Sequence, residues 1–260
     1  MVRELSMFRE RFRPFEGFFA LIGGAACDEW FTSLGLEFRA TKDLDLMLMI
    51  EVLNQEFITA MRAFIEEGEY EIRERANGAP ILYRFAKPKK ENFPSKLEFC
   101  SRNPAGFELG DGLHVIPVVI VPGHHSLSAI LADDAYYSLV RTHHDERDGL
   151  WVANATSLIP LKAHAWLRLT KLKADGEPVD SKDIEKHRAD VFRLAATLPA
   201  EPGPEIPGSI SVDLAQFLGS FPVGSAEWPA ILASLRTTFR IPPQPAVLRS
   251  AIQTYFRLPT

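Results

Sequence analysis

Near the N-terminus, the pattern of apolar and polar positions predicts a strand, a turn, a short helix and a second strand. Residues 18–22 are all apolar, as expected of a buried strand. Gly23 and Gly24 follow, and their lack of a Cβ allows backbone conformations and close approaches that other residues exclude. Residues 25–34 suit a short helix, with a glycine placed directly after it to end it. The second strand is predicted over 43–50.

Two acidic residues open this second strand. Asp43 and Asp45 alternate with Leu44 and Leu46, so in a strand both carboxylates lie on one face and both leucines on the other. Two neighbouring carboxylates repel each other, and a divalent cation removes that cost. Mg²⁺ prefers carboxylate oxygens together with substrate phosphates. The pattern therefore predicts a magnesium site at Asp43 and Asp45.

The rest of the chain shows both helical and strand periodicity. Helices are expected over 5–12, 54–67, 158–174 and 181–192, and three more over 212–221, 228–239 and 247–256. Strands are expected over 70–75, 81–85, 96–100 and 113–121, and a strand pair from 136–142 and 150–153. The sequence thus predicts an α/β (α+β) core with a mixed sheet flanked by helices over 1–155. A helical C-terminal region is predicted over 156–260.

Composition narrows the class of protein. The chain has 260 residues, 46% of them hydrophobic and 24% charged, which is enough to bury a sizeable core. A net charge of −5 argues against a uniformly basic surface but allows a local basic groove. Cys27 and Cys100 give no disulfide or zinc spacing and are expected to be small core residues. Because neither a signal peptide nor a membrane-spanning run is evident, we expect a soluble cytoplasmic protein.

The strand, the Gly23-Gly24 turn, the short helix and the Asp43-Leu44-Asp45 strand resemble the nucleotidyltransferase superfamily related to DNA polymerase beta. The stretch from Thr41 to Asp45, and its long separation from the glycines, is most similar to the AbiE-type (AbiEii) toxin branch. The resemblance implies Mg²⁺- or Mn²⁺-dependent transfer of a nucleoside monophosphate from an NTP to a hydroxyl. Gly23, Gly24 and Thr41 would then bind the nucleotide. It further implies an acceptor such as tRNA and a separately encoded antitoxin protein.

Enzymes of this superfamily place a third carboxylate on a strand beside the aspartate pair, as a base or metal ligand. Glu98 alternates with Leu97 and Phe99 in the predicted strand 96–100 and is the best candidate. The alternatives are Glu108 and Asp111, which flank glycines in a predicted turn. The resemblance thus implies a catalytic and metal-binding set of Asp43, Asp45 and Glu98.

The two helices predicted at 158–174 and 181–192 are similar to a helix pair of the AbiE-type toxins. Lys162 and Ala165 match the first helix, and Lys182-Asp183 match the opening of the second. The family's later arginine is out of register at Arg168, and Lys186 replaces its next acidic residue. The resemblance implies that Lys162 or Lys182 binds triphosphate and that Asp183 orients one of them. Because Lys162 lies among apolar residues, it needs either a partner or an opening to solvent.

Two other functional classes stay open on the residues alone. Glycosyltransferases and phosphatases also use Asp-x-Asp with Mg²⁺, although they do not need a preceding Gly-Gly. A non-catalytic nucleotide-binding protein with the same fold is the second alternative. A lysine-rich loop over 87–92 is also able to contact a phosphate backbone, although such loops are usually only solvated.

Overall fold

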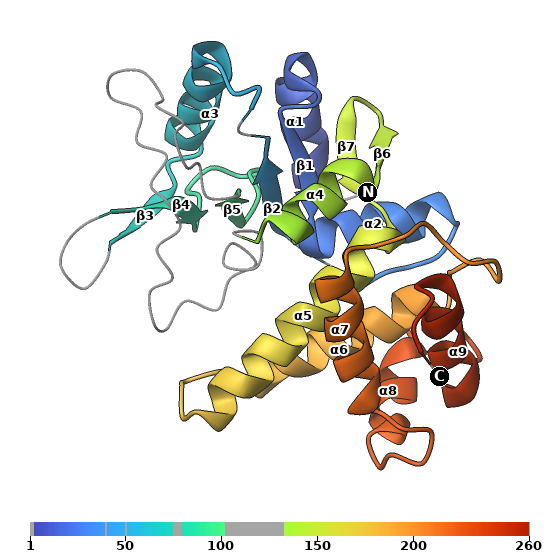
Figure 1. The fold of residues 1–260 in the computed structure, drawn as a ribbon. Coiled ribbons are helices and arrows are strands. Elements are labelled where there is room, and N and C mark those ends of the chain that lie inside the picture. The colour runs from blue at the N-terminus through green and yellow to red at the C-terminus, as the bar shows by residue number, and fades with distance from the viewer. Residues whose placement is uncertain (1–2, 40, 50, 75–79, 102–132, 260) are drawn as a thin grey trace. The chain divides into compact units, whose positions relative to one another are not determined.

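The computed structural model describes residues 3–39, 41–49, 51–74, 80–101 and 133–259 (Figure 1). These residues form two compact units, and each is described by itself. The sheet unit comprises the described residues of Met1–Glu29, Ala40–Pro122 and Ser126–Ala153. The helical unit comprises those of Trp30–Arg39 and Asn154–Thr260. The helical unit thus takes in the chain from Asn154 onward, together with the segment Trp30–Arg39.

One mixed sheet organises the sheet unit. Its strands among the described residues are β1 (Phe19–Ile22), β2 (Asp43–Leu48), β3 (Glu71–Glu74), β4 (Pro80–Ala86), β5 (Lys96–Cys100), β6 (His144–Arg147) and β7 (Leu150–Ala153). Their order across the sheet is β3-β4-β5-β2-β1-β7-β6. At its centre, β2 runs antiparallel to β1 and parallel to β5. The acidic strand is thus a central strand with hydrogen-bonded neighbours on both sides.

Aromatic packing covers one face of the central strands. The helices of this unit are α1 (Arg3–Phe12), the 3₁₀ turn η1 (Arg13–Phe15), the start of α2 (Gly23–Ser33), α3 (Gln55–Glu67) and α4 (Asp134–Thr142). Phe12 of α1 contacts Phe19 of β1 and Phe64 of α3, with ring centroids 6.2 and 5.5 Å apart. Phe19 pairs in register with Leu48, which puts it on the leucine face of β2. The aspartates of β2 therefore lie on the opposite face from this aromatic core.

The helical unit contains α5 (Ala155–Ala174), α6 (Ser181–Ala195), α7 (Gly208–Gly219), α8 (Trp228–Leu235) and α9 (Pro245–Tyr255). Helices α5 and α6 pack against each other, as Figure 1 shows. Asn154 and Asp180 cap them, each accepting a hydrogen bond from a backbone N–H two residues on. Trp166, Phe192 and Phe217 form part of an aromatic core between α5, α6 and α7.

The structure confirms the predicted α/β fold and corrects one element. Residues 136–142, predicted as a strand, lie in α4, which Asp133 caps. Tyr136, Tyr137 and Val140 are buried, and their spacing follows the period of a helix and not that of a strand. The antiparallel partner of Leu150–Ala153 is instead His144–Arg147, and β1 pairs with the same strand in parallel. The predicted strand 113–121 lies outside the described residues.

A separate search for membrane-spanning helices covered the described residues. None of their helices is long and apolar enough to cross a membrane.

Candidate functional site

Gly23 and Asp45 meet at the end of the first strand. Ile22, the last residue of β1, pairs in register with Asp45, and Gly23 begins α2 with a φ of +70°. A Cβ at Gly23 would lie only 2.0 Å from Oδ2 of Asp45, so the aspartate carboxylate occupies the space that a side chain would need. Gly24 is buried in the first turn of the same helix. The Gly-Gly turn and the acidic strand, separate in the sequence, are therefore one local structure.

The predicted carboxylates share one face of the sheet. Asp43 and Asp45 are partly exposed, while Leu44 and Leu46 on the opposite face are buried. Glu98 of β5 lies directly across from Asp45 in the parallel register, and pairs across a register share a face. The Asp43 side chain is 43% exposed, whereas that of Glu98 is only 5% exposed. Glu98, the predicted third carboxylate, thus lies beside the aspartate pair. The alternative candidates Glu108 and Asp111 lie outside the described residues.

Lys96 lies between two of these carboxylates. It pairs in register with Asp43, and its Nζ is 3.3 Å from both Oδ2 of Asp43 and Oε2 of Glu98. Sequence reasoning did not single out this lysine. The sequence does indicate that Lys96 lies on the same face as Glu98, because Lys96 comes two residues earlier and residues i and i+2 of a strand share a face. The face therefore carries three carboxylates and the Lys96 ammonium, and the register of β4 with β5 also places Arg84 opposite Glu98.

Cys100 lies on the same face as Glu98, and the negative charge of this face affects the pKa of its thiol. Its Sγ donates a hydrogen bond to the backbone oxygen of Leu46. Burial raises the pKa of the Cys100 thiol well above its usual value, and the negative charges of Asp45 and Glu98 raise it further. The thiol consequently stays protonated, and the prediction that both cysteines are small core residues is confirmed by their burial. Thr41 is half-buried two residues before Asp43.

The donor set of this face suits a hard divalent cation, since all three acids offer oxygen ligands. Within the described part of the chain, however, no three histidine, cysteine, aspartate or glutamate side chains are arranged to hold a metal ion. The positively charged ammonium of Lys96, rather than a metal ion, lies between Asp43 and Glu98. The described side chains of this face therefore form no metal site by themselves, and a cation at Asp43 and Asp45 would need oxygen ligands from a substrate.

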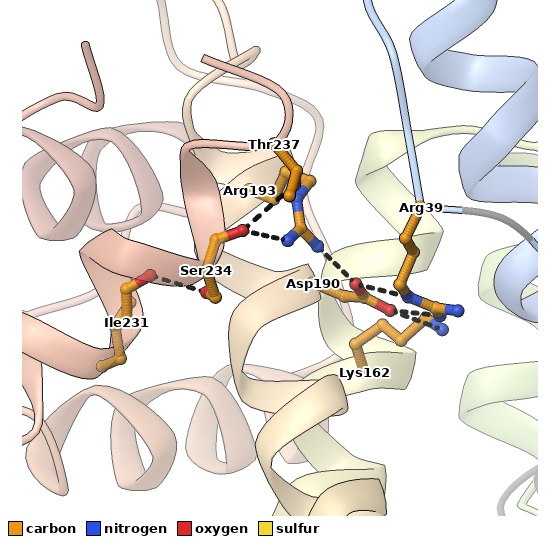
Figure 2. Close-up of polar contacts among 7 residues, drawn as sticks. All are labelled: Arg39, Lys162, Asp190, Arg193, Ile231, Ser234 and Thr237. Atoms are coloured by element: carbon orange, nitrogen blue, oxygen red, sulfur yellow. Dashed lines mark hydrogen bonds and ion pairs between the residues drawn. The ribbon is translucent and has the colours of Figure 1, made fainter. Parts of the chain in front are cut away.

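The helical unit contains a buried cluster of three cations around Asp190 of α6 (Figure 2). Nζ of Lys162 is 3.3 Å from Oδ2 of Asp190, and NH2 of Arg39 donates to the same oxygen at 2.9 Å. Arg193 donates to Oδ1 of Asp190 at 2.7 Å and to the backbone oxygen of Ser234 at 2.7 Å. Lys162 is only 2% exposed and Asp190 is fully buried. We call the four charged residues Arg39, Lys162, Asp190 and Arg193 the Asp190 cluster.

The Asp190 cluster carries more positive than negative charge. Burial alone would raise the pKa of Asp190, but Lys162, Arg39 and Arg193 hold it well below its usual range. Burial lowers the pKa of neighbouring His187 to about 3, and the charge of Lys162 contributes to this shift. Asp190 therefore remains ionised and His187 remains neutral near pH 7.

The partner of Lys162 differs from the expected one. Asp183, predicted to orient Lys162 or Lys182, forms no ion pair with either of these described lysines. Lys182 and Asp183 are exposed in the first turn of α6, where the N–H of Lys182 bonds to the capping Asp180. Asp190 lies two helical turns later, on the side of α6 that faces α5. The requirement that buried Lys162 have a partner is thus met by a residue that sequence reasoning missed.

The basic loop pairs its lysines with glutamates. Lys87 pairs with Glu71, and both Lys89 and Lys90 pair with Glu69. The loop therefore has little excess charge for a phosphate backbone.

A cavity of about 540 Å³ lies between α5, α6 and α8, lined in part by Trp166, Thr170, Arg188 and Ser234. None of the predicted site residues lines it.

Comparison of the chain with protein-family models, with curated proteins and with solved structures gives no match.

Proposed function

We propose that this chain is a nucleotidyltransferase that moves a nucleoside monophosphate from an NTP to a hydroxyl acceptor. The observation that carries the proposal is the fit between Gly23 and the Asp45 carboxylate, with Asp43 and Glu98 on the same sheet face. A glycine that leaves room for one particular carboxylate ties two sequence motifs to one site. A solvated pair of aspartates at a strand end requires no such fit.

In this proposal, Asp43 and Asp45 would hold Mg²⁺, which would supply charge compensation for the phosphates. The acceptor oxygen forms a bond to the α-phosphorus, and the bond from that phosphorus to the leaving pyrophosphate breaks. Glu98, beside Asp45, is placed to accept the proton of the acceptor hydroxyl. The exposure of Asp43 leaves one side of the pair open to substrate.

The excess positive charge of the Asp190 cluster has the sign that a triphosphate would compensate, but Lys162 and Asp190 are buried and paired with each other. Lys162 is kept as the proposed phosphate contact, and Lys182 and Asp183 are retained only by resemblance. A tRNA acceptor and an antitoxin partner likewise rest on the resemblance to AbiE-type toxins.

A labelled-nucleotide assay tests the chemistry. The protein is incubated with each α-labelled NTP, Mg²⁺ and total RNA, and label transferred to RNA is measured. Asp45→Asn is expected to abolish transfer while its melting temperature holds or rises, because one source of repulsion is removed. Glu56→Gln, a change at an exposed acid on α3, is the control and should transfer as wild type does. Equal transfer by wild type and Asp45→Asn would refute the assignment, as would no transfer by wild type with any NTP.

One observation favours a second candidate, a binding protein without catalysis. The Lys96 ammonium already neutralises part of the acidic face, so a protein that never binds metal would also be stable with this arrangement. Such a protein would bind NTP equally well with and without Mg²⁺. Calorimetry of NTP binding in EDTA and in MgCl₂ separates the two functions.

A further inference from the structure

Two buried polar atoms belong to residues that line the cavity between α5, α6 and α8. Oγ1 of Thr170, on α5, is buried and has no hydrogen-bond partner among the described residues. Nε of Arg188, on α6, is also buried, and the part of the chain that the structure describes offers it no acceptor. A buried polar group without a hydrogen bond costs free energy. Two such groups beside one cavity therefore point to a ligand that pairs with them.

Arg188 is placed to receive a carboxylate. Its side chain is 13% exposed, and its NH1 donates to Oε2 of Glu227, at the start of α8. Arginine binds both oxygens of a carboxylate through two parallel N–H groups, and one side of the guanidinium offers such a pair on Nε and NH2. Glu227 engages NH1 and does not occupy that side. A ligand carboxylate would therefore supply the acceptor that Nε lacks without displacing Glu227.

Aromatic side chains form part of the cavity wall. Trp166 of α5 and Phe221, two residues after α7, both line the cavity, with ring centroids 4.9 Å apart. Cζ of Arg188 lies 6.0 Å from the centroid of the Phe221 ring, so the cationic group is next to the aromatic wall. Aromatic walls favour a planar aromatic ligand through edge and face contacts. The volume of about 540 Å³ is in the range of small-molecule pockets.

The charges around the cavity limit the charge of the ligand. The described charged residues of the lining are Lys173, Glu185, Arg188 and Glu227, two of each sign. Such a balanced wall does not compensate a polyanion such as a triphosphate. A single carboxylate needs only one side of one guanidinium. The wall thus suits a ligand with one negative charge.

From this geometry we infer that the cavity is a binding site for a small aromatic carboxylate. The ring of the ligand packs against Trp166 and Phe221. Its carboxylate accepts hydrogen bonds from Nε of Arg188 and from the hydroxyl of Thr170. Because none of the residues proposed for nucleotide transfer lines the cavity, this site does not depend on the proposed function.

Calorimetry with two matched probes tests this site without Mg²⁺ or nucleotide. 2-Naphthoate carries a carboxylate on an aromatic ring system, and 2-naphthamide carries an uncharged amide on the same rings. Wild type should bind one molecule of naphthoate roughly ten- to a hundredfold more tightly than naphthamide, as for one charge-assisted hydrogen bond. Equal affinities for the two probes, or no saturable binding of naphthoate, would overturn the inference.

Thr170→Val separates ligand binding from a structural role. The change keeps the branched shape of the side chain and removes the unpartnered hydroxyl, so the melting temperature should hold or rise. Naphthoate affinity should fall by about three- to tenfold, as for one lost hydrogen bond. A lower melting temperature together with unchanged naphthoate affinity would show that the hydroxyl serves the fold and would contradict the site.

Arg188→Met removes the guanidinium and should lower naphthoate affinity to that of naphthamide, whose own affinity should not change. Arg240→Met, at an exposed position outside the cavity lining, is the control and should bind both probes as wild type does. Unchanged naphthoate affinity in Arg188→Met would refute the carboxylate contact. If Arg188→Met does not fold, the two probes compared in wild type and in Thr170→Val still decide the question.

Discussion

The two charged clusters of this protein have opposite composition and opposite access to solvent. The acidic face of the sheet unit groups the carboxylates of Asp43, Asp45 and Glu98 around Lys96, and Asp43 is 43% exposed. The Asp190 cluster of the helical unit groups three cations with one carboxylate, and Lys162 and Asp190 are buried. An excess charge next to solvent is available to a ligand. The same excess around a buried partner first serves the fold, because each buried charge needs compensation.

The difference shows that a charged residue inside an apolar pattern is not by itself evidence of a ligand. Lys162 was expected to need a partner or an opening to solvent, and Asp190 supplies the partner without any ligand. At the acidic face, by contrast, the ion pair between Asp43 and Lys96 is partly exposed to solvent. The acidic face is therefore the stronger functional candidate, and each of the following experiments tests that contrast.

The largest expected effect is at Asp190. Asp190→Asn leaves Lys162, Arg39 and Arg193 together without their carboxylate, so the free energy of unfolding should fall by about 3–5 kcal/mol. Lys162→Met should change stability by about 1 kcal/mol or less, because Asp190 keeps both arginines as hydrogen-bond donors. Urea denaturation measures both, with Asp183→Asn on the same helix as the exposed control.

The same Lys162→Met protein also tests the proposed phosphate contact. If Lys162 binds triphosphate, Mg²⁺·NTP affinity should fall by roughly ten- to a hundredfold, as for the loss of one charge-assisted hydrogen bond. Lys171→Met, at an exposed position of α5, is the control. Unchanged affinity in Lys162→Met would leave Lys162 a purely structural residue.

An intermediate effect is expected at Gly23. Gly23→Ala places a Cβ against the Asp45 carboxylate and keeps a positive φ, which alone costs roughly 1–2 kcal/mol. Gly35→Ala is a matched control, because Gly35 has a φ of +68° and a Cβ added there would meet no atom within 4 Å. Thermal unfolding should show a larger loss for Gly23→Ala, and Mn²⁺ affinity should fall only in that variant. Equal losses in the two variants would contradict the fit between Gly23 and Asp45.

The smallest effect near neutral pH concerns His187. Its pKa is lowered from 6.5 to about 3 by burial and by nearby positive charge, so the folded protein binds its proton less readily than the unfolded chain. The contribution of neutral His187 is fully present above pH 6.5 and is lost as pH falls towards 3. The slope is at most about 1.4 kcal/mol per pH unit. Urea denaturation at several pH values should show this slope reduced in His187→Gln, and an unchanged slope would argue against the buried cationic surroundings.

The sequence by itself determined the local structure around the acidic pair. All-apolar residues 18–22, the glycines after them and the alternation of Asp43 and Asp45 with leucines specified β1, the start of α2 and the two faces of β2. Side-chain caps such as Asn54, which accepts a hydrogen bond from the N–H of Phe57, were also readable. These features depend on neighbours within a few residues, so periodicity and capping rules reach them.

Only the tertiary structure decided which charges meet. The parallel register of β2 and β5 places Lys96 beside Asp43 and Glu98 beside Asp45, and no local pattern specifies a register between strands so far apart in the sequence. Arg39 reaches Asp190 from a segment 151 residues away, through the packing that assigns Trp30–Arg39 to the helical unit. Residues 136–142 became a helix for the same reason, because burial of one helical face outweighed a strand-like composition. Long-range packing selects among the structures that local chemistry allows, and the partners of buried charges are fixed at that stage.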